Sequence, residues 1–258
     1  MSTSLYCYDG RHHLEYGDYG DKSHPVVVAF HGLLGGAKLD QLGEFFSSHN
    51  RRLISVTRPG YGNASPVEFE HYRDIAKLYQ QLLDHLEITQ CELFGISAGA
   101  PHAYQLAALD SRISKVWIFS GLPLVCDPDI LKLYPPTLEE LYELARNSDR
   151  ISVGNQLHDM LFPEVSPELL ESEMYQFTMA HGGFALGQEI HFQSSMTCEE
   201  FENITAPIAL QHSKVDTMVP FSAAEETARK LGAEFIPEEQ GEHADLDNMQ
   251  KLLSLMVS

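Results

Sequence analysis

The sequence is poor in positive charge. Lys and Arg number 17 against 37 Asp and Glu, which gives a formal net charge of −20 over 258 residues. Nucleic acids and anionic membranes are bound through clustered Lys and Arg side chains, and no such cluster occurs along the chain. Neither nucleic acid nor membrane is therefore an expected partner. The acidic excess predicts a solvated surface that favours solubility.

Long hydrophobic runs are also missing. No stretch is long enough to span a bilayer, and the first residues have neither the basic region nor the apolar run of a signal peptide. A cytoplasmic protein is therefore expected. The hydrophobic content of 43% excludes a disordered chain and suits one large domain, with or without an insertion.

Cysteine is scarce and carries no motif. The four cysteines lie far apart without a C-x-x-C pair, at Cys7, Cys91, Cys126 and Cys198. This spacing favours reduced structural thiols over a disulfide framework or a zinc site. H-E-x-x-H, G-x-G-x-x-G and P-loop motifs are absent as well. No metal and no cofactor is expected.

What the sequence does contain is an alternation of buried strands with amphipathic helices. After hairpin-like residues 4–20, apolar runs alternate with segments that show the i, i+3, i+4 pattern. The predicted strands are 25–30, 53–57, 91–94, 116–119, 208–212 and 234–236, and the predicted helices are 39–48, 75–86, 100–109, 223–231 and 246–256. Such alternation predicts an α/β fold with a parallel sheet.

The alternation stops between residues 123 and 200. That stretch is punctuated by prolines and reads as helical at 138–146, 153–161 and 167–180. We expect residues 1–122 and 201–258 to form the core, and residues 123–200 to be an inserted helical lid.

One pentapeptide places a serine between two glycines: Gly95-Ile96-Ser97-Ala98-Gly99. It follows a predicted strand and precedes a predicted helix. A turn of this kind lifts the serine hydroxyl clear of the sheet and leaves room only for glycine-sized neighbours. Ser97 is therefore the candidate nucleophile.

A serine nucleophile needs a histidine as general base and a carboxylate to orient that histidine. In a parallel sheet these groups must come from loops at the carboxyl ends of the strands. Asp216 follows the predicted strand 208–212, and His243 follows the predicted strand 234–236. Both candidates meet the condition, and the chain order is Ser97, Asp216, His243.

This order, with the serine on a G-x-S-x-G turn, resembles the α/β-hydrolase fold family. Nearly the whole chain takes part in the resemblance. The other matching motifs are the His31-Gly32 pair, the turn at 58–65, Asp-x-x-Val-Pro at 216–220 and Gly-x-His at 241–243. The resemblance implies a mostly parallel, largely eight-stranded twisted sheet flanked by helices, with an inserted helical cap.

The resemblance also implies a role for each residue. Ser97 would attack a carbonyl carbon, His243 would take its proton and pass it to the leaving group, and Asp216 would stabilise the imidazolium. The backbone N–H groups of Leu33 and Ala98 would form the oxyanion hole. One such donor is typically worth about 100- to 1,000-fold in rate.

The sequence leaves the identity of the acid open. Asp245 and Glu242 lie near His243 in the sequence, and either could replace Asp216 as the acid. His31 is expected to hold the oxyanion loop in shape.

Two further residues are candidates for the substrate pocket. His102 and Met218 are expected to line it, and a packing role is the alternative for both.

The predicted function is that of a serine hydrolase. It would cleave a small, largely apolar ester, lactone or thioester through an acyl-enzyme, with a small-molecule substrate as its partner. One alternative is a carbon–carbon bond hydrolase or lyase-like relative with the same triad. Another is a non-catalytic ligand-binding protein of the same fold. The oligomeric state is not predicted.

Overall fold

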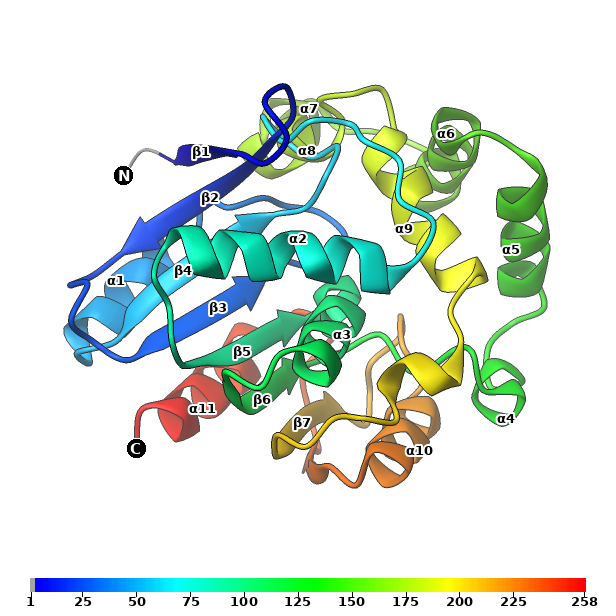
Figure 1. Cartoon of the computed structure of the whole chain (residues 1–258). Coiled ribbons are helices and arrows are strands. Elements are labelled where there is room, and N and C mark those ends of the chain that lie inside the picture. Colours follow the sequence, from blue (N-terminus) through cyan, green and yellow to red (C-terminus); the bar gives the residue numbers. More distant parts are fainter. Residues whose placement is uncertain (1–2) are drawn as a thin grey trace.

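The computed structural model describes residues 3–258. Within that range eight strands form one sheet, in the order β1-β2-β4-β3-β5-β6-β7-β8 (Figure 1). The strands are β1 (Ser4–Cys7), β2 (His13–Tyr19), β3 (Val26–Phe30), β4 (Arg52–Thr57), β5 (Cys91–Ile96), β6 (Ile113–Phe119), β7 (Ile208–Ser213) and β8 (Glu234–Glu238). β1 and β2 pair antiparallel, and β3 to β8 run parallel. The predicted fold class is confirmed.

Helices cover both faces of this sheet (Figure 1). β3 lies between β4 and β5, and all five of its residues are buried. One face packs against α1 (Asp40–Ser48) and α11 (Leu246–Met256). The other face packs against α2 (Tyr72–His85), α3 (Ala100–Leu109) and α10 (Phe221–Leu231). Burial on both sides explains why the central strands are continuous apolar runs.

The chain between β6 and β7 is helical. It contains α4 (Pro128–Leu131), α5 (Thr137–Asn147), α6 (Arg150–Leu161), α7 (Pro167–Glu171), α8 (Glu173–Thr178), α9 (Phe184–Ser194) and the 3₁₀ turn η2 (Cys198–Phe201). The single helix expected at 167–180 is two helices, because Ser172 ends α7 and its hydroxyl caps α8 by accepting the N–H of Tyr175. We call residues 123–200 the α4–α9 segment.

Sequence periodicity did not predict α9. Ten of its residues are buried, so it has no solvent-facing side to create an amphipathic pattern. It packs backbone to backbone on α6 through glycines: a Cβ at Gly187 would lie 1.7 Å from the Arg150 carbonyl oxygen, and one at Gly154 would lie 1.8 Å from that of Gly183. Glycine at these positions lets α9 lie deep inside the α4–α9 segment.

A disulfide joins the two ends of the α4–α9 segment. Cys126 is bonded to Cys198, with a Cα–Cα distance of 5.5 Å, and the two cysteines are 72 positions apart in the sequence. The prediction of four reduced thiols is wrong for this pair, while Cys7 and Cys91 are free. The α4–α9 segment leaves the core and rejoins it at neighbouring points, which brings the two cysteines together. The spacing of the cysteines along the sequence does not reveal this. Disulfides are rare in cytoplasmic proteins, so this bond does not support the expected cytoplasmic location. That location stays a prediction.

In residues 3–258, no helix combines the length and the apolar character that a membrane crossing would need.

Removing the disulfide is expected to destabilise the protein. The bond closes a loop of 72 residues, so replacing Cys126 and Cys198 by serine should lower the free energy of unfolding by about 2–4 kcal/mol. Guanidinium unfolding without reductant measures this difference. Cys7→Ser, at an exposed free thiol, is the control and should unfold like the wild type. A double variant as stable as the wild type would contradict the assignment.

Candidate active site

Ser97 occupies a strained turn between β5 and α3. It is the first residue of the 3₁₀ turn η1 (Ser97–Gly99), and its φ is 49°, in the left-handed region. The space around it is tight: a Cβ on Gly99 would lie 2.3 Å from the Phe30 carbonyl oxygen, and one on Gly95 would lie 3.0 Å from the Ala100 Cα. Strain of this kind persists where the surrounding structure fixes the backbone.

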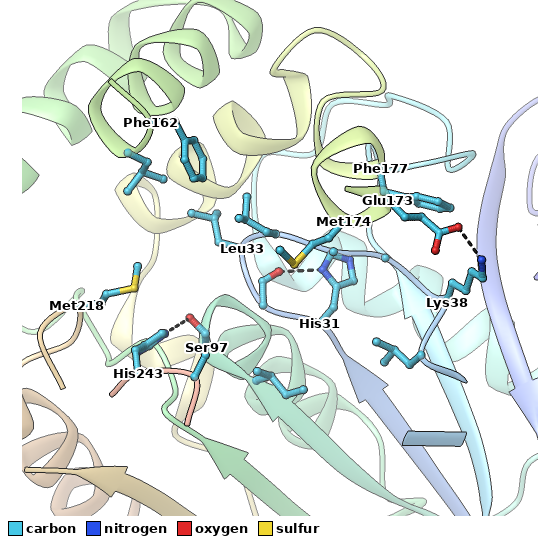
Figure 2. Close-up of a pocket in the computed structure, with 18 residues that line it drawn as sticks. His31, Leu33, Lys38, Ser97, Phe162, Glu173, Met174, Phe177, Met218 and His243 are labelled. Atoms are coloured by element: carbon cyan, nitrogen blue, oxygen red, sulfur yellow. Dashed lines mark hydrogen bonds and ion pairs between the residues drawn. The ribbon is translucent and has the colours of Figure 1, made fainter. Parts of the chain in front are cut away.

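Three of the predicted residues come together at the carboxyl edge of the sheet. The His243 Nε2 lies 2.8 Å from the Ser97 Oγ (Figure 2). On the other side of the ring, the His243 Nδ1 lies 2.7 Å from the Asp216 Oδ2. Asp216 comes from the loop after β7, and His243 comes from the loop after β8. With a proton on Nδ1 donated to Asp216, Nε2 is free to accept the Ser97 hydroxyl.

The carboxylate of Asp216 is firmly held. Its Oδ1 accepts the backbone N–H groups of Met218 at 2.8 Å and Val219 at 2.9 Å. Burial acts to raise the pKa of Asp216, but the hydrogen bonds from His243 and Val219 outweigh burial, and the net pKa is lowered. The group is therefore a carboxylate at neutral pH.

The two rival acids have other partners. Asp245 caps α11, where its Oδ1 accepts the N–H of Asn248 at 2.9 Å. Glu242 accepts the hydroxyl of Thr217 at 3.2 Å. The geometry therefore favours Asp216 as the partner of His243.

The loop after β3 lies beside Ser97. A Cβ on Gly32 would be 3.7 Å from the Ser97 Cβ, which places the Gly32–Leu33 peptide next to the hydroxyl. Ala98 follows Ser97 directly and is buried. Both predicted oxyanion donors are thus adjacent to Ser97, and their role stays a prediction.

His31 is buried in this loop as a neutral ring. Its Nδ1 lies 2.8 Å from the Gly32 carbonyl oxygen, and its Nε2 accepts the backbone N–H of Arg58 at 3.4 Å. Burial and the nearby Arg58 charge hold the pKa of His31 well below its usual range. These contacts fit a residue that shapes the loop.

A cavity of about 700 Å³ opens beside Ser97 and His243. Its walls are mainly apolar and come both from the loop after β3 and from the α4–α9 segment, which supplies Phe162, Met174 and Phe177 (Figure 2). Away from Ser97, Lys38 forms an ion pair of 2.7 Å with Glu173. Sequence reasoning missed these lining residues because their helices had no predicted position relative to the core.

The structure separates the two predicted pocket residues. Met218 lines the cavity and is exposed. His102 is fully buried inside α3, with its Nδ1 3.0 Å from the Tyr79 hydroxyl and its Nε2 3.2 Å from a Glu189 carboxylate oxygen. The expectation for His102 is therefore corrected, because α3 turns this side chain toward α2 and α9 instead of the cavity.

Residues 3–258 offer no ready site for a metal ion. This part of the chain contains no group of three or more His, Cys, Asp or Glu side chains arranged to hold a metal ion.

Comparison with known proteins shows what this chain is similar to. The family described as "alpha/beta hydrolase fold" matches residues 25–243. The uncharacterized hydrolase YcgS of Bacillus subtilis (strain 168) is 23% identical over 198 residues, which cover 67% of this chain and 68% of that protein. An esterase (EaEST) from Exiguobacterium antarcticum has a TM-score of 0.75 at 21% identity, over 99% of this chain and 98% of that one. A bromoperoxidase from Bacillus anthracis has a TM-score of 0.76 at 19% identity, with the same coverage.

The strain at Ser97 predicts an unusual order of stabilities. Because glycine adopts positive φ without steric cost, Ser97→Gly should be more stable than Ser97→Ala by about 1 kcal/mol in urea unfolding. At Ser254, an exposed position within α11, the order should reverse, since glycine is unfavourable in a helix. An alanine variant at position 97 that equals the glycine variant would show that the turn is not strained.

Proposed function

Since the chain belongs to the α/β-hydrolase fold family, we propose that it is a serine hydrolase acting on a small, largely apolar ester, lactone or thioester. One observation carries the proposal. Ser97 Oγ, His243 and Asp216 form a continuous hydrogen-bonded chain, with links of 2.8 Å and 2.7 Å, beside an apolar cavity. Such a chain is the arrangement that activates a serine hydroxyl.

Acylation begins when His243 Nε2 takes the proton from Ser97 Oγ as the oxygen attacks the substrate carbonyl carbon. Asp216 stabilises the imidazolium that forms. The tetrahedral oxyanion receives the backbone N–H groups of Leu33 and Ala98, which are fixed before the reaction starts. The carbon–oxygen or carbon–sulfur bond then breaks, and His243 passes the proton to the leaving alkoxide or thiolate.

Deacylation repeats these steps with water. His243 removes a proton from water as the oxygen attacks the acyl carbon, and the second tetrahedral intermediate uses the same two N–H donors. The bond to Ser97 breaks, Ser97 regains its proton from His243, and the carboxylic acid leaves. No other reactant is needed.

The cavity supports the proposed substrate class. Its volume of about 700 Å³ lies within the usual range for small-molecule sites. Met174, Phe177 and Phe162 line it from the α4–α9 segment, for which we propose the role of a lid that sets specificity. The similar protein from Exiguobacterium antarcticum is named an esterase, so the same fold is used for ester substrates elsewhere.

A series of p-nitrophenyl esters of increasing acyl length tests this function. We expect turnover of acetyl to octanoyl esters, whose acyl chains fit within the cavity of about 700 Å³. Lactones and thioesters of similar size belong in the same screen. Cleavage of a vinylogous diketone without any ester turnover would favour a carbon–carbon bond hydrolase. Tight binding with no turnover of any compound would favour a ligand-binding protein.

The acid of the triad is tested by two matched amide variants. Asp216→Asn removes the charge that faces His243, and kcat should fall about 10⁴-fold, as in serine proteases. Asp245→Asn makes the same chemical change at the cap of α11 and should leave kcat near that of the wild type. Steady-state kinetics on the best ester measures both. The reverse result would make Asp245 the acid.

A further inference from the structure

A fully buried ion pair lies behind the loop that supplies the predicted oxyanion donor. Arg58 Nε is 2.7 Å from a Glu189 carboxylate oxygen, and each side chain is only 1% exposed. Burial acts to raise the pKa of Glu189, but Arg58 and His102 outweigh it, so the net pKa is lowered and both groups are charged. The pair joins two distant parts of the chain, the turn after β4 and helix α9.

The guanidinium of Arg58 holds the loop after β3 by its carbonyl oxygens. Its Nη1 donates to the His31 carbonyl oxygen, and its Nη2 donates to the Gly32 carbonyl oxygen at 2.9 Å. The Nη2 also reaches the Tyr61 hydroxyl at 3.3 Å, and that hydroxyl donates to the Leu33 carbonyl oxygen at 2.8 Å. Three consecutive carbonyl groups are thus fixed by one side chain and its neighbour.

Fixing a carbonyl also aims the N–H on the other side of the same peptide. The Gly32 carbonyl and the Leu33 N–H belong to one planar trans peptide and point in opposite directions. Besides Arg58, the Gly32 oxygen lies 2.8 Å from the His31 Nδ1. Because both groups hold the oxygen, the plane of this peptide, and with it the direction of the Leu33 N–H, has little freedom.

Glu189 makes this arrangement possible. A guanidinium buried without a counter-charge is strongly unfavourable, and the carboxylate that balances Arg58 comes from α9. The second Glu189 oxygen lies 3.2 Å from His102 Nε2, and His102 Nδ1 lies 3.0 Å from the Tyr79 hydroxyl of α2. Glu189 is therefore held between Arg58 in the turn after β4 and His102 in α3.

We propose that the Arg58–Glu189 pair is a positioning device for the oxyanion hole: it sets the direction of the Leu33 N–H and makes transition-state stabilisation depend on helix α9. This inference rests on the proposed function. Arg58 and Glu189 are positioning residues, since they act through the Gly32–Leu33 peptide and touch no reacting atom. An effect of this kind lowers kcat and leaves KM nearly unchanged, because the oxyanion exists only in the transition state.

The experiment compares two variants with a matched control. Glu189→Gln keeps the shape but removes the charge, and Tyr61→Phe removes the hydroxyl that holds the Leu33 carbonyl without unpairing a buried charge. Tyr142→Phe is the control, because Tyr142 donates to Gln193 of α9 at 2.9 Å and so loses a buried hydroxyl contact elsewhere on this helix. Each variant is assayed per mole of folded protein with an ester that the wild type hydrolyses.

We expect Glu189→Gln to lower kcat about 10- to 100-fold, a part of the effect of losing one oxyanion donor. Tyr61→Phe should lower kcat several-fold and Tyr142→Phe should not change it, with KM nearly constant throughout. Affinity for a trifluoromethyl ketone, whose adduct with Ser97 carries an oxyanion, should fall in proportion to kcat.

Other outcomes overturn the inference in distinguishable ways. If Tyr61→Phe and a folded Glu189→Gln keep wild-type kcat and inhibitor affinity, the pair has only a structural role and the proposed function stands. If Glu189→Gln does not fold, an unchanged kcat in Tyr61→Phe alone overturns the inference. A wild type that hydrolyses no ester, lactone or thioester overturns the proposed function and this inference with it.

Discussion

The arrangement of the site depends on one constraint, the parallel alignment of β3, β5, β6, β7 and β8 within a single sheet. Parallel strands place their carboxyl ends at one edge, so the loops that follow them must meet there. The loop after β3 passes Ser97, which follows β5, while Asp216 and His243 follow β7 and β8. Residues separated by 146 positions in the sequence thereby come within hydrogen-bonding distance. The core fixes the central strands by burying them on both faces, as in β3 and β7.

Much of the sheet and the positions of Ser97, Asp216 and His243 could be predicted from the sequence, because the sequence patterns that indicate them are local. The apolar runs of the central strands, the glycines around Ser97 and the position of Asp216 after β7 each reflect nearby backbone geometry. The features that escaped prediction depend on contacts between distant segments. The Cys126–Cys198 bond needs the two ends of the α4–α9 segment to meet. His102 does not line the cavity, because its side chain is buried in contacts with Tyr79 of α2 and Glu189 of α9.

Helix α9 shows most clearly why part of the site could not be predicted from the sequence. Its buried polar residues remove the amphipathic pattern, and one of them, Glu189, forms an ion pair with Arg58 in the turn after β4. Charged residues are almost never fully buried unless they are paired, but the sequence does not reveal which residue is the partner. The α4–α9 segment therefore supplies cavity walls through α6 and α8, and a buried charge through α9. Under the proposed function, substrate specificity and the geometry of the oxyanion loop would both depend on this segment.

The central claim is that Ser97 is a nucleophile activated by His243. Labelling with a fluorophosphonate, followed by mass spectrometry of the digested protein, tests it most directly, because the reagent bonds only to an activated serine. A single adduct is expected on the peptide that contains Ser97, absent in Ser97→Ala and formed much more slowly in His243→Ala. A folded wild-type protein that acquires no adduct, or that acquires one at another serine, would contradict it.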